Sequence, residues 1–152
     1  MSTDRPAIRY GDFADLARLI ELATAFWRES IYGRLFPMAP AYALESLVRT
    51  ALTAGVVFVA EVDGRVVGML GAVPVTLPLT GEIIVEELAW YVEPAYRSGR
   101  TGPLLLTALE DWTYKKGAVV LKMVAPADKP EVAKYYRRHG YTEVEVAYMK
   151  RL

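Results

Sequence analysis

The chain has 152 residues, enough for one domain with a single hydrophobic core. Hydrophobic residues make up 53% and charged residues 24%, a composition typical of a globular chain and not of a disordered one. Eighteen basic and eighteen acidic residues cancel, which argues against broad electrostatic binding to nucleic acid. With no cysteine and one histidine, the sequence excludes a disulfide framework, a cysteine nucleophile and a histidine-rich metal site.

The polar N-terminal segment carries no signal-peptide core, and the apolar stretches are too short to span a bilayer. We therefore expect a soluble cytoplasmic protein without a membrane partner. No repeat, low-complexity tract or long linker interrupts the chain, so residues 1–152 are expected to form one domain.

The first third of the chain predicts a strand and two helices. A short strand is expected at 7–10, and Asp12 is expected to cap a helix near 12–29 whose apolar side chains recur at helical spacing. The segment 30–40 contains one glycine and two prolines, which predicts a loop or broken turn. A second helix is expected near 40–53.

The middle of the chain predicts three consecutive strands. β-Branched residues indicate a strand at 56–62, and Asp63-Gly64 is a strong hairpin signal before a returning strand at 65–75. A third strand is expected at 83–92 after a loop. Consecutive strands of this kind favour antiparallel pairing.

The last third predicts alternating helices and strands. Pro103 suits the first turn of a helix that ends at Gly117. A strand at 118–125, a helix at 130–139 and one or two strands over 141–149 follow. The sequence thus predicts a mixed α/β fold: a mostly antiparallel sheet of six to seven strands with about four helices on both faces.

A turn rich in glycine and arginine separates the strand at 83–92 from the next helix. Small residues allow a ligand close to the backbone, and the unpaired N–H groups at a helix start favour an anion such as a diphosphate. Two arginines can add charge-assisted hydrogen bonds. The competing interpretation is a solvated turn whose glycines only satisfy backbone geometry. The candidate anion-binding residues are Arg97, Ser98, Gly99, Arg100, Thr101, Gly102 and Pro103.

Two motifs resemble the GNAT acetyltransferase superfamily. That family's phosphate turn is usually Arg/Gln-x-x-Gly-x-Gly/Ala, preceded by Val-x-Pro-x-Tyr-Arg, and its last helix often ends Tyr-x-x-x-Gly-Phe/Tyr. The fourth place of the turn here is Arg100, with the glycine one position earlier. The family often has an asparagine before the last helix, which bonds the pantetheine arm, where this chain has Lys129. The matching segments are Val92-Glu93-Pro94-Ala95-Tyr96-Arg97, then Gly102, and Tyr136-Arg137-Arg138-His139-Gly140-Tyr141.

The resemblance implies an N-acetyltransferase that takes an acetyl group from acetyl-CoA and needs no metal. In the family, pantetheine lies where the central strand splays from its neighbour, and it pairs with exposed backbone groups. Mapped onto this chain, those groups belong to Trp90, Tyr91 and Val92.

Amine acetylation needs a base for the ammonium proton and an acid for the leaving thiolate. Glu86 and Glu87 are the candidate bases, because a carboxylate inside an apolar strand has a raised pKa. Adjacent strand residues face opposite sides, so one of the two is expected to face the acceptor unless a bulge intervenes. The resemblance makes Tyr136 the candidate acid. The alternatives are surface glutamates and a packed aromatic side chain.

The resemblance also places the acceptor near the loop between the first two helices. The candidate acceptor residues there are Trp27, Glu29, Tyr32 and Phe36, where aromatic side chains can pack an amine and Glu29 can attract a cation. An ordinary hydrophobic lid is the alternative. The acceptor, a small-molecule or peptide amine, is not fixed by the sequence, and a homodimer is compatible with it.

Two other function classes compete with the enzyme. A non-catalytic acyl-CoA-binding or regulatory module would keep the phosphate turn without a working base or acid. An unrelated nucleotide-binding domain is disfavoured, because the sequence contains neither a Walker pattern nor a Gly-x-Gly-x-x-Gly turn after an early strand.

Overall fold

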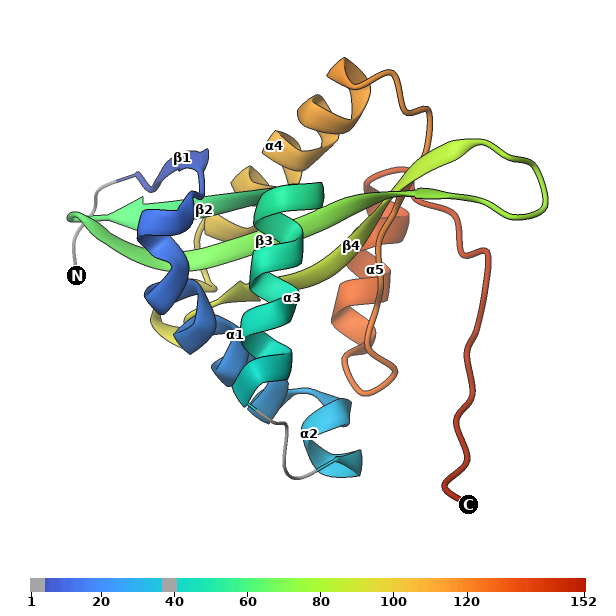
Figure 1. Ribbon diagram of the computed structural model, residues 1–152, viewed down its shortest axis with the longest axis horizontal. Coiled ribbons are helices and arrows are strands. Elements are labelled where there is room, and N and C mark those ends of the chain that lie inside the picture. The colour runs from blue at the N-terminus through green and yellow to red at the C-terminus, as the bar shows by residue number, and fades with distance from the viewer. Residues whose placement is uncertain (1–4, 37–40) are drawn as a thin grey trace.

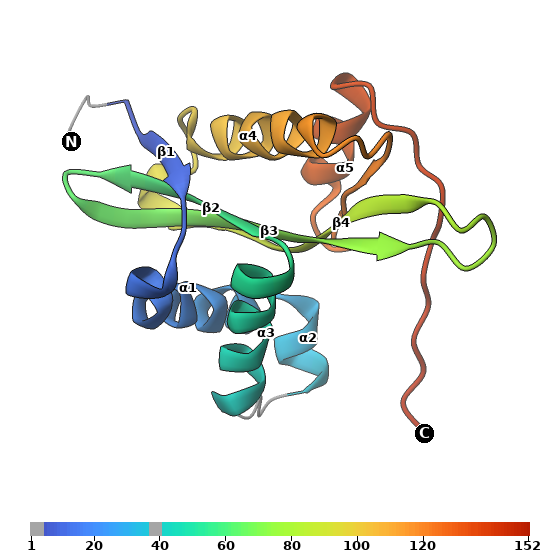
Figure 2. The ribbon, with the colours of Figure 1, turned by 45° about the horizontal axis from the view of Figure 1, so that its top comes forward.

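The computed structural model describes residues 5–36 and 41–152, which form a three-layer α/β/α arrangement. Figure 2 shows α1, α2 and α3 on one face of the sheet and α4 and α5 on the other. The strands are β1 (Ala7–Tyr10), β2 (Val56–Val62), β3 (Arg65–Thr76), β4 (Ile83–Val92) and β5 (Leu121–Lys122). The helices are α1 (Leu16–Glu29), α2 (Ile31–Leu35), α3 (Ala41–Ala54), α4 (Thr101–Lys115) and α5 (Pro130–Arg138).

The sheet has the order β1-β2-β3-β4-β5, with antiparallel pairing throughout except for the parallel pair β4·β5. Figure 1 shows β1 to β4. The predicted mixed, mostly antiparallel α/β fold with helices on both faces is confirmed. The strand count differs slightly, since five strands are formed and not six to seven.

The difference in strand count arises at the C-terminal end of the chain. The strand predicted at 118–125 is formed only at Leu121–Lys122, and no strand is assigned over 141–149. Gly140 turns the chain after α5 with φ +85°, and the last segment runs away from the sheet as an extended chain (Figure 1). Without an adjacent strand, its alternating apolar residues are exposed, Val146 at 62% and Tyr148 at 91%.

The expected cap at Asp12 begins a 3-10 turn, Phe13–Asp15, which leads into α1. Asp12 accepts a hydrogen bond from the Ala14 N–H (2.8 Å) and forms a capping box with Asp15. The segment predicted as a loop after α1 contains the short helix α2, which begins because the Ser30 side chain accepts from the Gly33 N–H. The predicted start of the second helix at residue 40 lies outside the described residues.

Left-handed backbone geometry explains the tight β2–β3 hairpin. Asp63 and Gly64 have φ values of +51° and +75°, the conformation that a two-residue turn between twisted strands requires. The predicted turn is therefore confirmed at these two residues.

Two apolar cores cover the two faces of the sheet. One lies between the sheet and α1 and α3, and the other lies between the sheet and α4 and α5. The first includes Leu19, Leu22, Ala23, Val48, Ala51, Val57, Val59 and Met69. The second includes Phe58, Val67, Leu70, Val85, Val92, Leu105, Leu109 and Tyr136.

A bulge in β4 changes which face its side chains reach. Gly71 pairs with Ala89 but Ala72 pairs with Glu87, so Leu88 is an additional residue on β4. Leu88 and Ala89 both pack on the α1/α3 side, whereas Glu87 lies on the α4/α5 side. Because of the bulge, Glu87 and Ala89 lie on opposite faces of the sheet although they are two residues apart.

Candidate active site

The two edges of β4 are paired to different extents. β3 pairs along β4 from Ile83 to Val92. β5 pairs in register only at Val85↔Leu121 and Glu86↔Lys122, and the chain then diverges from β4. The second half of β4 therefore has one edge without a paired strand, as expected for a ligand that pairs with backbone groups.

Glu87 lies where β4 and β5 separate. Its Oε2 accepts a hydrogen bond from the Val124 backbone N–H at 2.8 Å, so a side chain and not a strand backbone occupies that amide. Burial raises the pKa of the Glu87 carboxyl to about 7, and the Val124 hydrogen bond opposes this only in part. A carboxyl that titrates near neutral pH is suited to proton transfer.

Tyr136 bonds the backbone of the same residue, Val124, at its carbonyl oxygen. Its hydroxyl donates to the Val124 carbonyl oxygen at 3.2 Å. Burial raises the pKa of Tyr136 well above its ordinary range, and the nearby Glu87 carboxylate adds to the effect. The phenol is therefore protonated at neutral pH and can act as a proton donor.

Aromatic rings surround Tyr136 on the α4/α5 side. Its ring centroid lies 6.1 Å from that of Trp90 and 5.3 Å from that of Tyr141. The Tyr141 hydroxyl donates to Glu110 of α4 at 2.6 Å. These contacts fix the Tyr136 ring beside β4, so the structure also agrees with the packing role that the sequence left open.

Glu86 points to the opposite face from Glu87, as the alternation of strand side chains predicts. Its Oε1 lies 3.2 Å from Nζ of Lys122, which also pairs with Glu145 of the C-terminal segment at 3.3 Å. Glu86 is half-buried on the face that carries α1 and α2, whose side chains were expected to line the acceptor site.

The N-terminus of α4 presents backbone amides without a side-chain cap. Arg100 is the N-cap residue, and its side chain makes no capping hydrogen bond. Ser98, Gly99 and Arg100 are exposed, and a Cβ at Gly99 would meet open space. A Cβ at Gly102 would lie in ordinary contact with the Trp90 ring, at 3.5 Å, so the start of α4 lies beside Trp90 of β4. The geometry suits an anion at the helix start.

Thr101, Pro103 and Lys129 complete the expected cofactor set. Thr101 is buried and Pro103 is exposed in the first turn of α4. Lys129 precedes α5, and its charge acts on Glu29. Contacts of all these residues with a cofactor stay predictions.

Arg97 is engaged away from the helix start. Its Nε donates to the Val92 carbonyl oxygen at 2.7 Å, and Nη2 donates to Glu29 Oε2 at 2.7 Å. Its guanidinium also lies over the Tyr91 ring, 5.1 Å from the centroid. A direct contact with a diphosphate would require this side chain to leave Glu29, so that expectation also stays a prediction.

The four expected acceptor residues lie at the end of α1 and along the α2 segment. Tyr32 and Phe36 are 48% and 56% exposed, whereas Trp27 and Glu29 are half-buried. Glu29 is already bonded by Arg97 and by the Tyr91 hydroxyl. Arg34 of α2 forms an ion pair with Asp128 in the β5–α5 segment, which connects the α1/α2 side with the segment before α5.

Sequence reasoning missed Val124 and Asp128. Val124 acts through its backbone, and no side-chain signal distinguishes it from any other strand residue. Asp128 is an ordinary loop acid whose partner is 94 residues away in the chain, so the pair is evident only after folding.

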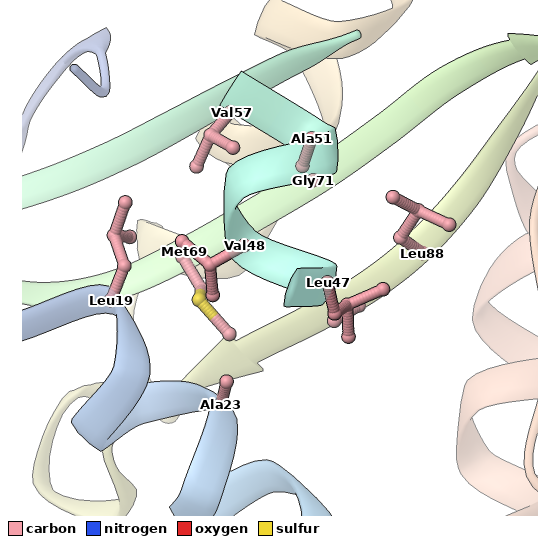
Figure 3. Close-up of a pocket in the computed structure, with 10 residues that line it drawn as sticks. Leu19, Ala23, Leu47, Val48, Ala51, Val57, Met69, Gly71 and Leu88 are labelled. Atoms are coloured by element: carbon pink, nitrogen blue, oxygen red, sulfur yellow. The ribbon is translucent and has the colours of Figure 1, made fainter. Parts of the chain in front are cut away.

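The α1/α3 side contains a small cavity, of about 20 Å³, which does not resemble a substrate site. Figure 3 shows apolar side chains from α1, α3 and the sheet around it, and no polar side chain is among its lining residues. A cavity of this size and polarity is dry packing space. The lining residues are Leu19, Ala23, Leu47, Val48, Ala51, Val57, Met69, Gly71, Leu88 and Ala89.

Residues 5–36 and 41–152 contain no group of three or more His, Cys, Asp or Glu side chains able to hold a metal ion. Among the helices of the same described residues, none has the length and apolar character needed to cross a membrane.

Comparison with known proteins identifies the family. The model of the acetyltransferase (GNAT) family matches residues 17–141, most of the chain, and includes β4, the α4 turn and α5. The chain belongs to this family, which confirms the resemblance seen in the two sequence motifs. No curated protein matches the sequence.

Solved structures share the whole fold. A ribosomal-protein-alanine N-acetyltransferase from Brucella melitensis biovar Abortus 2308 has a TM-score of 0.76 and 20% identity, covering 98% of this chain and 100% of that chain. The aminoglycoside acetyltransferase AAC(6')-Iy, in complex with the bisubstrate analogue CoA-S-monomethyl-acetylneamine, has a TM-score of 0.72 and 22% identity. The match covers 98% of this chain and 100% of that chain.

A transcriptional regulator from Bacillus halodurans C-125 has a TM-score of 0.73 and 15% identity, and the match covers 97% of this chain and 100% of that chain. At such identities these likenesses show the fold alone, which occurs both in acetyltransferases and in a protein described as a transcriptional regulator.

Proposed function

We propose that the protein transfers an acetyl group from acetyl-CoA to an amine. The observation that carries the proposal is Glu87, a carboxyl with a pKa of about 7 at the point where β4 and β5 separate. Tyr136 of α5 donates to the carbonyl oxygen of Val124, the residue whose N–H donates to Glu87. The proposed base and the proposed acid are thus both bonded to the backbone of Val124.

The proposed cofactor position follows from two features of the fold. The uncapped N-terminus of α4 would bind the diphosphate of CoA through its amides, and Arg100 would add positive charge. Pantetheine would then lie along the unpaired edge of β4, beside Trp90, Tyr91 and Val92. Structures of family relatives with CoA or a CoA analogue support this choice of ligand.

The proposed reaction is direct attack by the acceptor. The Glu87 carboxylate takes a proton from the ammonium group, and the neutral amine attacks the thioester carbonyl carbon. The C–N bond forms as the C–S bond breaks, and the leaving thiolate takes the Tyr136 phenolic proton. The second proton of the attacking nitrogen is then lost as the amide forms and restores the Tyr136 phenol through solvent, while Glu87 releases the first proton to solvent. A backbone N–H on the open edge of β4 would polarise the carbonyl oxygen.

The acceptor is proposed to approach from the α1/α2 side, where Glu86, Tyr32 and Phe36 lie at or near the surface, and its amine would reach Glu87 through the gap where β4 and β5 separate. Exposed aromatic rings can pack the body of an amine, and Glu86 can attract its positive charge. Structurally similar proteins are an aminoglycoside acetyltransferase and a ribosomal-protein-alanine acetyltransferase, so the proposed acceptor class is an amine on a small molecule or peptide.

The test is CoA release from acetyl-CoA with a panel of amines, measured by thiol detection over a pH range. The wild-type rate is expected to fall as the pH is lowered through about 7, because the base becomes protonated. Glu87→Gln should abolish this dependence, and Glu86→Gln should retain it. Binding of acetyl-CoA without release on any amine would favour the non-catalytic module and contradict the enzyme proposal.

A further inference from the structure

Glu29 connects the end of α1 with the end of β4. It is the last residue of α1, and its Oε1 accepts a hydrogen bond from the Tyr91 hydroxyl at 2.9 Å. Its Oε2 accepts from Arg97 Nη2 at 2.7 Å. Burial opposes the charge of Glu29, but Arg97 and Tyr91 together hold the pKa of its carboxyl below the ordinary value. The carboxylate is therefore ionised at neutral pH and accepts two hydrogen bonds.

Arg97 is the residue through which this carboxylate reaches the α4 turn. Nε of Arg97 is bonded to the last carbonyl of β4, at Val92, and the guanidinium packs on the Tyr91 ring. The Arg97 side chain thus touches α1 and two residues of β4. Its own backbone begins the turn that leads to α4.

The next part of the turn is much less enclosed. Ser98, Gly99 and Arg100 are exposed, and the side chain of Arg100 does not cap α4. The position of the α4 amides relative to β4 consequently depends on the two ends of the turn. Arg97 is hydrogen-bonded at one end, and Gly102 lies near the Trp90 ring at the other.

We propose that Glu29 is a positioning residue for cofactor binding, which holds the turn 97–102 against α1 and β4 through Arg97 and Tyr91. The inference rests on the proposed function, because it assumes that the turn binds the diphosphate of CoA. It differs from the sequence-based expectation that Glu29 attracts a cationic acceptor, since the cation at Glu29 is Arg97 of the same chain.

The expected effect is moderate. The Arg97 and Glu29 side chains are 42% and 35% exposed, and an isolated ion pair with that exposure contributes little. The substitution would also weaken the hydrogen bond from Tyr91 and leave the turn less ordered, and both changes would increase the loss of affinity. Glu29→Gln is expected to weaken CoA binding by about three- to tenfold.

The experiment measures dissociation constants by calorimetry for CoA and for its nucleotide half, 3'-phosphoadenosine 5'-diphosphate. Both ligands contain the diphosphate, so Glu29→Gln should weaken both by the same factor. In the Arg97→Gln background, Glu29→Gln should cause no further loss, because the two residues act as one unit. A structural role that only stabilises the fold would lower the melting temperature and leave both constants unchanged.

Glu45→Gln is the matched control. Glu45 pairs with Arg49 on α3 at 2.8 Å with comparable exposure, and it lies on a helix that does not carry the turn. Its CoA affinity should equal that of the wild type.

Three results would overturn the proposal. They are unchanged or tighter CoA binding by a folded Glu29→Gln variant, a loss for CoA that the nucleotide half does not share, or additive losses with Arg97→Gln. If the wild-type protein itself fails to bind CoA, the proposed function fails and this inference fails with it.

Discussion

The two edges of β4 differ in what they bind. One edge is paired with β3 from Ile83 to Val92, whereas the other is paired with β5 at only two residues. The paired edge belongs to a closed apolar layer, and the open edge carries Glu87, Val124 and Tyr136. A single strand thus supplies rigidity on one side and accessible polar groups on the other.

The difference between the two edges is the reason that we place the proposed site where the sheet is incomplete. Completing the β4·β5 pairing would satisfy every backbone group and leave no room for a ligand. The extra residue at Leu88 and the short β5 prevent that completion. We expect substitutions at the open edge to affect chemistry and those beside the paired edge to affect stability.

The largest expected effect is at Glu87. Glu87→Gln removes the proposed base while keeping a hydrogen-bond acceptor for the Val124 N–H. We expect kcat/KM for acetyl transfer to fall by about 10²- to 10⁴-fold, because general-base catalysis contributes that much. Steady-state kinetics measures the loss, with Glu86→Gln as the neighbouring control. Equal losses in the two variants would remove the distinction between the two glutamates.

On the α1/α3 face of the sheet, Leu19→Ala should reduce stability and not cofactor binding. Leu19 is fully buried in α1 and lines the small apolar cavity of Figure 3. Truncation is expected to lower the free energy of unfolding by about 2 to 5 kcal/mol, since it enlarges a void that does not collapse fully. Urea denaturation measures this change. A weakened CoA affinity in the folded variant would show that the two sides are not separable.

Tyr136→Phe should have a smaller effect on turnover. The variant keeps the packed ring beside Trp90 and removes only the hydroxyl that donates to Val124. We expect kcat to fall by about 10- to 100-fold, at the lower end of general-acid contributions, while the melting temperature stays near that of the wild type. An unchanged kcat would assign Tyr136 to packing alone.

The smallest effect concerns stability and pH. Burial raises the pKa of Glu87 to about 7 in the folded state, so the folded protein holds a proton that the unfolded chain releases at lower pH. The stability associated with that proton is present at pH 4 and is lost as the pH rises through about 7. Glu87→Gln should therefore raise the melting temperature relative to wild type at pH 8, and by less at pH 5. The same difference at both pH values would contradict the raised pKa.

Part of this fold could be predicted because local signals and tertiary packing agree. The strands at 7–10, 56–62 and 83–92 have the predicted bounds, and Asp63-Gly64 forms the expected turn. Strands with β-branched residues and a two-residue turn with positive φ are specified within a few residues of sequence.

Other features depend on contacts between distant residues. The strand predicted at 118–125 is formed only at Leu121–Lys122, and beyond it the Val124 amide donates to the Glu87 side chain; the segment at 141–149 has no strand beside it. Arg97 was expected at the diphosphate, but its partner Glu29 is 68 residues away in the sequence. Such partners are set by the fold, and a local pattern does not reveal them.

A crystal structure of the protein with bound CoA would test whether the α4 turn and the gap between β4 and β5 hold the cofactor. We predict diphosphate oxygens within hydrogen-bond distance of the backbone amides in the turn that starts α4. We also predict the pantetheine arm between β4 and Val124, ending beside Glu87 and Tyr136. A diphosphate bound elsewhere, or a pantetheine arm outside the gap between β4 and β5, would contradict the account.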